Sequence, residues 1–131
     1  MRLAYFDSSA IVKLAHLEPE SQALIDYLSA DDLEVSTSVV AEIEVIRAVR
    51  RLRDAKSESA DAMKGFYLLG LDDEIREDAC AIGAATLRSL DAVHLATALA
   101  IGEDDLEFIT YDDRLADAAR KEGLTVLQPG R

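Results

Sequence analysis

Short apolar runs alternate along this chain with longer segments in which apolar residues recur at helical spacing. The runs cover residues 3–6, 33–35, 108–111 and 124–127, with a weaker one at 68–71. Strands that alternate with helices imply crossover connections and therefore a parallel sheet. A chain of 131 residues has little room for a second core. We therefore predict a single α/β domain over residues 1–131, with a central parallel sheet flanked by helices.

Two aspartates stand at the ends of predicted strands. Asp7 directly follows the run 3–6, and Asp112 closes the run 108–111. A carboxylate is rarely placed against a core unless a cation or a hydrogen-bond donor compensates it. In parallel α/β sheets, ligands collect beyond the carboxyl ends of the strands. Both side chains are therefore expected near a binding site.

Two further acids lie in the first turns of predicted helices. Asp91 shares a helical face with Leu95, and Glu42 shares one with Ile46. Helices that follow parallel strands tend to begin at the same edge of the sheet, so these carboxylates are expected to meet the other two. Acids are also favoured in first helical turns because they cap the helix and complement its dipole. That structural alternative applies to each acid taken singly.

Carboxylates crowded at one edge would repel one another and raise one another's pKa unless a cation joined them. Hard oxygen ligands suit Mg²⁺ or Mn²⁺ better than zinc, and the chain offers only one Cys and two His for a zinc site. Divalent metals can activate water and stabilise a leaving oxygen in phosphodiester hydrolysis. The four acids therefore predict a metal-dependent nuclease.

The charge of the chain limits how it could bind nucleic acid. A net charge of −12 argues against broad nonspecific binding, which needs a basic face. The dense group of basic residues comprises Arg47, Arg50, Arg51, Arg53 and Lys56. These side chains are candidates for RNA phosphate contacts, and Arg114, just after Asp112, is a separate candidate. The alternative is a solvated face whose cations pair with the abundant acids.

Smaller polar residues flank the acids. Ser9 and Thr110 lie beside the two strand ends, where either hydroxyl could hold a metal-bound water, although capping or turn bonding explains Ser9 as well. His94 lies three residues after Asp91 and could touch substrate or orient a carboxylate. The favoured interpretation of His94 is a packed core histidine that is hydrogen-bonded to its neighbours.

Other features bear on the compartment. The longest apolar stretches are far short of a membrane span, and Asp7 interrupts the N-terminal run before it could act as a signal peptide. The single cysteine excludes an internal disulfide framework and suits a reducing cytoplasm. This Cys80 has apolar neighbours and is expected to be buried. The sequence thus predicts a cytoplasmic protein without membrane contact.

Four segments resemble, in order, the motifs of PIN-domain ribonucleases, specifically the VapC-type toxins of type II toxin–antitoxin pairs. The segments are Tyr5–Leu14, Ser38–Glu42, Leu90–Ala98 and Ile109–Asp112, the last followed by Arg114 and Leu115. Each motif alone is weak, but four in order over the whole chain are specific.

The resemblance implies a PIN-like three-layer fold and endoribonuclease cleavage of RNA. It implies an acidic site formed by Asp7, Glu42, Asp91 and Asp112. Asp7 and Asp91 would be the main ligands of Mg²⁺ or Mn²⁺. Asp113 adds an acid beside Asp112, and which of the two faces the metal stays open, with Asp112 favoured.

The resemblance also implies a homodimer that is silenced by a cognate VapB-type antitoxin. A non-enzymatic alternative remains, in which a PIN-fold module uses its acidic pocket mainly to engage a basic partner protein. Two other classes fit less well. A haloacid-dehalogenase-type enzyme would have a second Asp where Ser9 stands, and a receiver domain would have a Lys after the last strand, where Gln128 and Pro129 stand.

Overall fold

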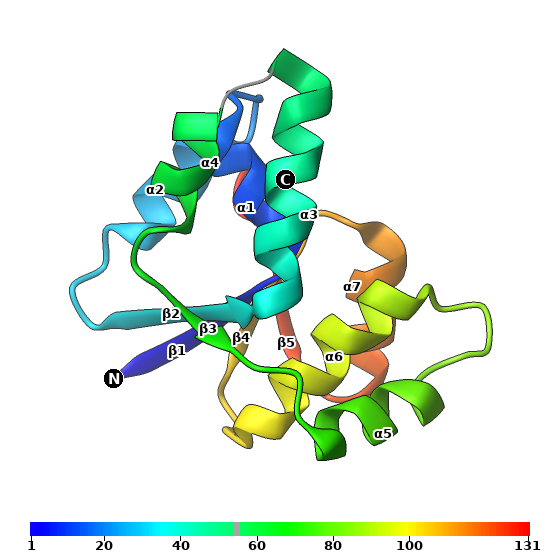
Figure 1. The fold of residues 1–131 in the computed structure, drawn as a ribbon. Coiled ribbons are helices and arrows are strands. Elements are labelled where there is room, and N and C mark those ends of the chain that lie inside the picture. The colour runs from blue at the N-terminus through cyan, green and yellow to red at the C-terminus, as the bar shows by residue number, and fades with distance from the viewer. Residues whose placement is uncertain (54–55) are drawn as a thin grey trace.

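All five apolar runs contribute strands in the computed structural model, which describes residues 1–53 and 56–131 (Figure 1). The strands are β1 (Arg2–Phe6), β2 (Leu33–Ser38), β3 (Phe66–Leu69), β4 (Glu107–Ile109) and β5 (Thr125–Leu127). They form a sheet in the order β3-β2-β1-β4-β5, and each neighbouring pair is parallel. The predicted α/β fold with a central parallel sheet is confirmed.

Helices cover both faces of this sheet, which gives three layers (Figure 1). The helices are α1 (Ser8–Ala15), α2 (Ser21–Leu28), α3 (Val39–Arg53), α4 (Lys56–Met63), α5 (Asp73–Ala81), α6 (Ser89–Ile101) and α7 (Asp113–Lys121). The first four contribute to the core cluster on one face, and α6 and α7 contribute to the cluster on the other. Helix α5 packs mainly against α6.

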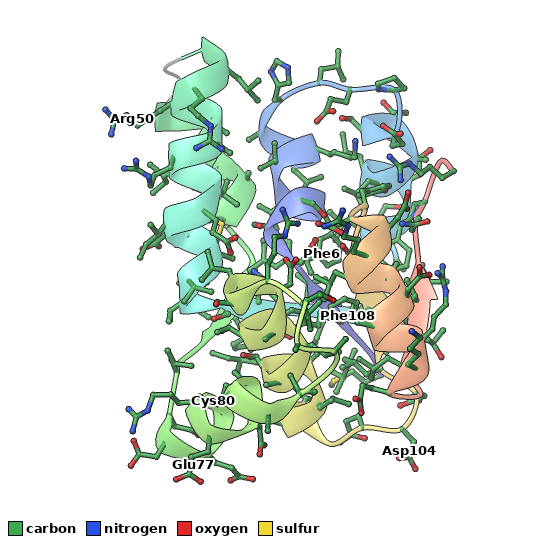
Figure 2. All side chains as sticks on the ribbon, turned by 90° about the vertical axis from the view of Figure 1, so that its right-hand side faces the viewer. Phe6, Arg50, Glu77, Cys80, Asp104 and Phe108 are labelled. Carbon is green, nitrogen blue, oxygen red and sulfur yellow. The ribbon has the colours of Figure 1, made fainter. Side chains whose placement is uncertain are left out.

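The two core clusters follow from the alternation of side chains along β1. Neighbouring residues of a strand point to opposite faces, so Tyr5 and Phe6 belong to different clusters. Phe6 lies in the cluster that contains Ile11 and Leu24. On the other face, the rings of Tyr5 and Phe108 are stacked with centroids 5.5 Å apart. Figure 2 shows Phe6 and Phe108 in the interior, which explains why the central strands are continuously apolar.

The strand order reverses at β1, and this reversal fixes where a ligand can bind. From β1 the chain adds β2 and β3 on one side, and later adds β4 and β5 on the other. A crevice therefore opens at the carboxyl ends of β1 and β4, the switch point at which α/β sheets bind ligands. Asp7 follows β1, and Thr110 and Asp112 follow β4, so the topology brings these residues to the crevice.

The prediction that Cys80 is buried is wrong. Cys80 is exposed on α5, at the surface of the molecule in Figure 2. Helix α5 lies at the periphery against α6, and Ile75 is its one buried residue, so apolar neighbours in the sequence do not place Cys80 in the core. Among the described residues, no helix has the length and apolar character needed to cross a membrane.

Candidate active site at the switch point

A pocket of about 800 Å³ lies at the carboxyl ends of β1 and β4. Five acidic side chains line it: Asp7, Glu18, Glu44, Asp91 and Asp112. Glu18 lies between α1 and α2 and pairs with Lys13 at 3.4 Å, so the other four are the acids of the candidate site. They come from the end of β1, from α3, from the first turn of α6 and from the start of α7. The structure therefore brings together three of the four predicted acids and adds one that the sequence analysis did not select.

Glu42 does not line this pocket. Its side chain is exposed, whereas Glu44 lies on the pocket side of α3. Two steps along an α-helix rotate a side chain by about 200°, so Glu42 and Glu44 point to nearly opposite sides. The buried stripe of α3 runs through Ala41, Val45 and Val49, and Glu44 borders it. The apolar residues Ala41, Val45 and Val49 beside Glu44 could have indicated its position from the sequence. Glu42 has the apolar Ile46 four residues later, so the apolar pattern alone does not distinguish the two glutamates.

Asp7 is the most deeply buried acid of the site, with 2% of its surface exposed. Its Oδ1 accepts hydrogen bonds from Ser9 Oγ at 2.7 Å and from the Ala10 N–H at 3.1 Å, so it caps α1. Its Oδ2 accepts one from Thr110 Oγ1 at 2.7 Å. Burial raises the pKa of Asp7, and the hydrogen bonds from Thr110 and Ser9 act against that rise.

Thr110 is hydrogen-bonded to both Asp7 and Asp112, the acids that follow β1 and β4. Its hydroxyl donates to Asp7 and accepts the N–H of Asp112 at 3.1 Å, and the residue is fully buried. Asp112 in turn caps α7, because its Oδ1 accepts the N–H groups of Arg114 and Leu115 at 3.0 and 3.1 Å. Capping and a place in the pocket are thus combined in Asp112, as they are in Asp7.

Asp91 and Asp112 share a cation, Arg88, at the start of α6. Arg88 Nε donates to Asp91 Oδ2 at 3.0 Å, and Arg88 Nη2 donates to Asp112 Oδ2. Burial raises the pKa of Asp91, the contact with Arg88 lowers it, and the nearby charge of Asp112 raises it again. Asp113 points elsewhere: 81% of its side chain is exposed and it pairs with Arg131. Of the neighbouring aspartates, Asp112 is the one that lines the pocket.

A buried chain of hydrogen bonds holds Glu44 in place. His94 Nε2 lies 2.7 Å from Glu44 Oε1, and His94 Nδ1 lies 2.7 Å from the Tyr5 hydroxyl. An ionised carboxylate only accepts, so Nε2–H donates to Glu44 and the Tyr5 hydroxyl donates to Nδ1. His94 is 1% exposed. The predicted packed histidine is confirmed, and it also orients a carboxylate.

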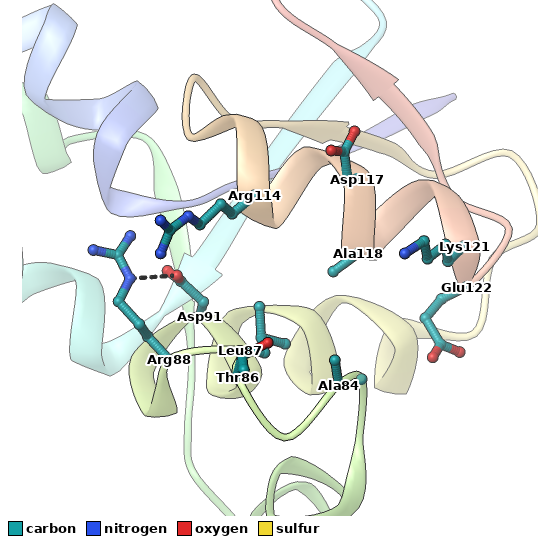
Figure 3. Close-up of a pocket in the computed structure, with 11 residues that line it drawn as sticks. Ala84, Thr86, Leu87, Arg88, Asp91, Arg114, Asp117, Ala118, Lys121 and Glu122 are labelled. Carbon is teal, nitrogen blue, oxygen red and sulfur yellow. Dashed lines mark hydrogen bonds and ion pairs between the residues drawn. The ribbon is translucent and has the colours of Figure 1, made fainter.

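The predicted phosphate-binding arginines lie in three places. Arg47 and Arg51 line the pocket with the acids, whereas Arg50 points away into solvent (Figure 2). Arg114 lines a neighbouring groove between α6 and α7 (Figure 3). The side chains of Arg53 and Lys56 lie outside the described residues. Further cations at the pocket are Lys13, Arg88 and Arg131, which the sequence analysis did not single out.

The oxygen ligands at this site are of the type that a hard divalent cation prefers, but they are not close enough together to coordinate one. The carboxylates of the candidate site line one pocket, and oxygen ligands are those that Mg²⁺ and Mn²⁺ prefer. Within residues 1–53 and 56–131, however, no three Asp, Glu, His or Cys side chains are grouped closely enough to hold a metal as they stand. The oxygens are turned instead toward Ser9, Thr110, His94 and Arg88.

A parallel sheet with a pocket of acidic and basic side chains at its switch point is the arrangement with which α/β domains bind ligands. The model of the PIN domain family matches residues 4–121, and the chain belongs to this family.

Individual proteins agree with this assignment. The chain is 43% identical to ribonuclease VapC46 of Mycobacterium tuberculosis over 130 residues, 98% of this chain and 99% of that protein. It is 37% identical to ribonuclease VapC47 of the same species over 133 residues, 98% of each chain. A solved toxin–antitoxin complex from Klebsiella pneumoniae contains a chain that shares this fold. That chain is 24% identical with a TM-score of 0.72, and the match covers 96% of this chain and 97% of the other.

Proposed function

We propose that this chain is the toxin of a VapBC-type toxin–antitoxin pair and an endoribonuclease that hydrolyses RNA phosphodiester bonds with Mg²⁺ or Mn²⁺. The observation that carries the proposal is the gathering of Asp7, Glu44, Asp91 and Asp112 around one pocket at the switch point. Membership of the PIN family and the ribonuclease names of the relatives support it.

We propose Asp7 and Asp91 as the main metal ligands, with Glu44 and Asp112 completing the shell. Glu44 replaces Glu42 in this proposal, because Glu42 faces away from the pocket. A bound metal would supply a water of lowered pKa and positive charge beside the scissile phosphate. The protein positions these carboxylates through hydrogen bonds: Ser9 and Thr110 orient Asp7, and His94 orients Glu44.

The test of this function is metal-dependent RNA cleavage by the purified protein. Total RNA and single-stranded oligonucleotides should be cut in the presence of Mg²⁺ or Mn²⁺, and the cutting should stop when EDTA is added. Gel analysis of end-labelled RNA measures both. If several RNAs stay intact with either metal, the chain is better explained as a PIN-fold module whose acidic pocket engages a basic partner protein.

Arg47 and Arg51 are proposed to bind RNA phosphates on the α3 side of the pocket. Arg51→Ala should weaken binding of single-stranded RNA about three- to tenfold and should lower the salt dependence of binding by about 0.7 in the log–log slope. Arg50→Ala is the matched control, because Arg50 lies on the same helix but outside the pocket. Fluorescence anisotropy in EDTA, which keeps the RNA intact, measures both variants. Equal losses in both would refute a phosphate track at the pocket.

The proposed partners are RNA, a cognate VapB-type antitoxin and a second copy of the chain. The solved structure from Klebsiella pneumoniae, a toxin–antitoxin complex, supports the antitoxin. Exposed apolar side chains such as Leu17 and Ile25, at 83% and 47% exposure, are available for such contacts. Because RNA is the proposed substrate, the cytoplasm is the proposed compartment.

A further inference from the structure

Arg88 reaches from solvent onto two largely buried acids. Its side chain is 63% exposed, whereas those of Asp91 and Asp112 are 13% and 21% exposed. The planar guanidinium spans both carboxylates, with Nε on one and Nη2 on the other. It thereby supplies positive charge to the part of the pocket where these two acids face each other.

Arg88 also occupies the oxygens that a metal would need. Asp112 Oδ1 is engaged by the N–H groups of Arg114 and Leu115 at the start of α7. Its other oxygen, Oδ2, is engaged by Arg88. Because breaking the cap would destabilise α7, the oxygen that Asp112 can release at least cost is the one that Arg88 holds.

A second groove beside the pocket is a place where Arg88 could bind an anion. This α6–α7 groove, of about 790 Å³, begins at Asp91 of α6 and runs between α7 and the segment that leads into α6. Figure 3 shows Arg114 beside the Arg88–Asp91 pair, and Asp117 and Lys121 line the groove farther along α7. Arg88 and Asp91 line both this groove and the acidic pocket, so Arg88 stands at their junction.

We propose that Arg88 is a displaceable counter-ion: it holds Asp91 and Asp112 in the metal-free protein, and metal binding releases it to bind an RNA phosphate in the α6–α7 groove beside Arg114. This inference rests on the proposed function. A divalent cation takes over the neutralisation of the two carboxylates, and the freed guanidinium meets the anion that the metal brings. Arg88 thus couples metal binding to RNA binding.

The experiment compares wild-type protein with Arg88→Ala, Arg88→Lys and Arg76→Ala. Arg76 is the matched control, because its side chain is also 63% exposed and pairs with Asp73 far from the pocket. Titration calorimetry with Mn²⁺ should show about three- to tenfold tighter binding to Arg88→Ala, because the competing cation is gone. Arg88→Lys, which keeps the charge but cannot span both acids, should lie between. The KM for an RNA oligonucleotide should rise about three- to tenfold in Arg88→Ala.

The outcomes separate this inference from the proposed function. Mn²⁺ uptake that is equal or weaker in Arg88→Ala than in wild type would overturn the displaceable counter-ion and leave Arg88 as a structural link between α6 and α7. Tighter Mn²⁺ binding with an unchanged KM would overturn the phosphate contact. If wild type and Arg76→Ala take up no Mn²⁺ at all, the proposed function fails first, and this inference fails with it.

Discussion

Asp7→Asn is expected to lower the rate of RNA cleavage by about a thousandfold or more, because a main metal ligand loses its charge. The substitution keeps the size of the side chain and one acceptor oxygen for the cap of α1. Cleavage of an end-labelled RNA, measured under single-turnover conditions at saturating Mn²⁺, gives the rate. Asp113→Asn is the control: Asp113 neighbours the pocket but is exposed, and its variant should cleave at the wild-type rate. Comparable losses in both variants would contradict the assignment.

The same variant has a pH signature in the absence of metal. Burial raises the pKa of Asp7 in the folded protein, whereas the unfolded chain has an ordinary Asp pKa of about 3.9. Between these two values the folded state holds more protons than the unfolded state, so the contribution of Asp7 to the free energy of unfolding falls as pH rises. Asn does not titrate, so the free energy of unfolding of the variant does not contain this pH-dependent decrease.

Relative to wild type, Asp7→Asn should therefore become more stable as pH rises above about 4, even if lost hydrogen bonds lower its stability by a constant amount. Urea unfolding in EDTA at several pH values measures the difference. A difference that is independent of pH would show that burial does not shift the titration of Asp7.

The sequence predicted the parts of this protein that depend on local pattern and topology. Apolar runs bounded by polar residues form strands. The acids that directly follow two of these runs must lie at the same edge, because the sheet is parallel. Asp7 and Asp112 could be selected for this reason. Asp91 could be selected because it shares a helical face with Leu95, which is buried in α6.

Features that depend on tertiary contacts could not be predicted in this way. Arg88 meets Asp112 across 24 positions of the sequence, and only the approach of α6 to α7 brings the two together. The exposure of Cys80 depends on the peripheral position of α5, which its own sequence does not encode. Arg47 and Arg50 look alike in the sequence, and only the rotation of α3 about its axis separates them.

The choice between Glu42 and Glu44 is the sharpest example of this limit. Helix α3 carries apolar residues on more than one face: Val45 and Val49 are buried, whereas Ile43 is 61% exposed and Leu52 is 52% exposed. An apolar stripe therefore does not determine which face meets the sheet. The buried contacts made by Val45 and Val49 set that rotation, and Glu44 follows them into the pocket.

Glu44→Gln is accordingly expected to reduce kcat/KM for RNA by about a hundredfold, whereas Glu42→Gln should stay within about twofold of wild type. Gln at position 44 can still accept the hydrogen bond from His94 Nε2, so the fold and the position of the side chain should be kept while the negative charge is lost. Calorimetry should show weaker Mn²⁺ binding in Glu44→Gln alone. A loss in Glu42→Gln that equals the loss in Glu44→Gln would mean that α3 presents a different face to the metal. Because both substitutions remove one charge from the same helix, long-range electrostatics cannot account for a difference between them.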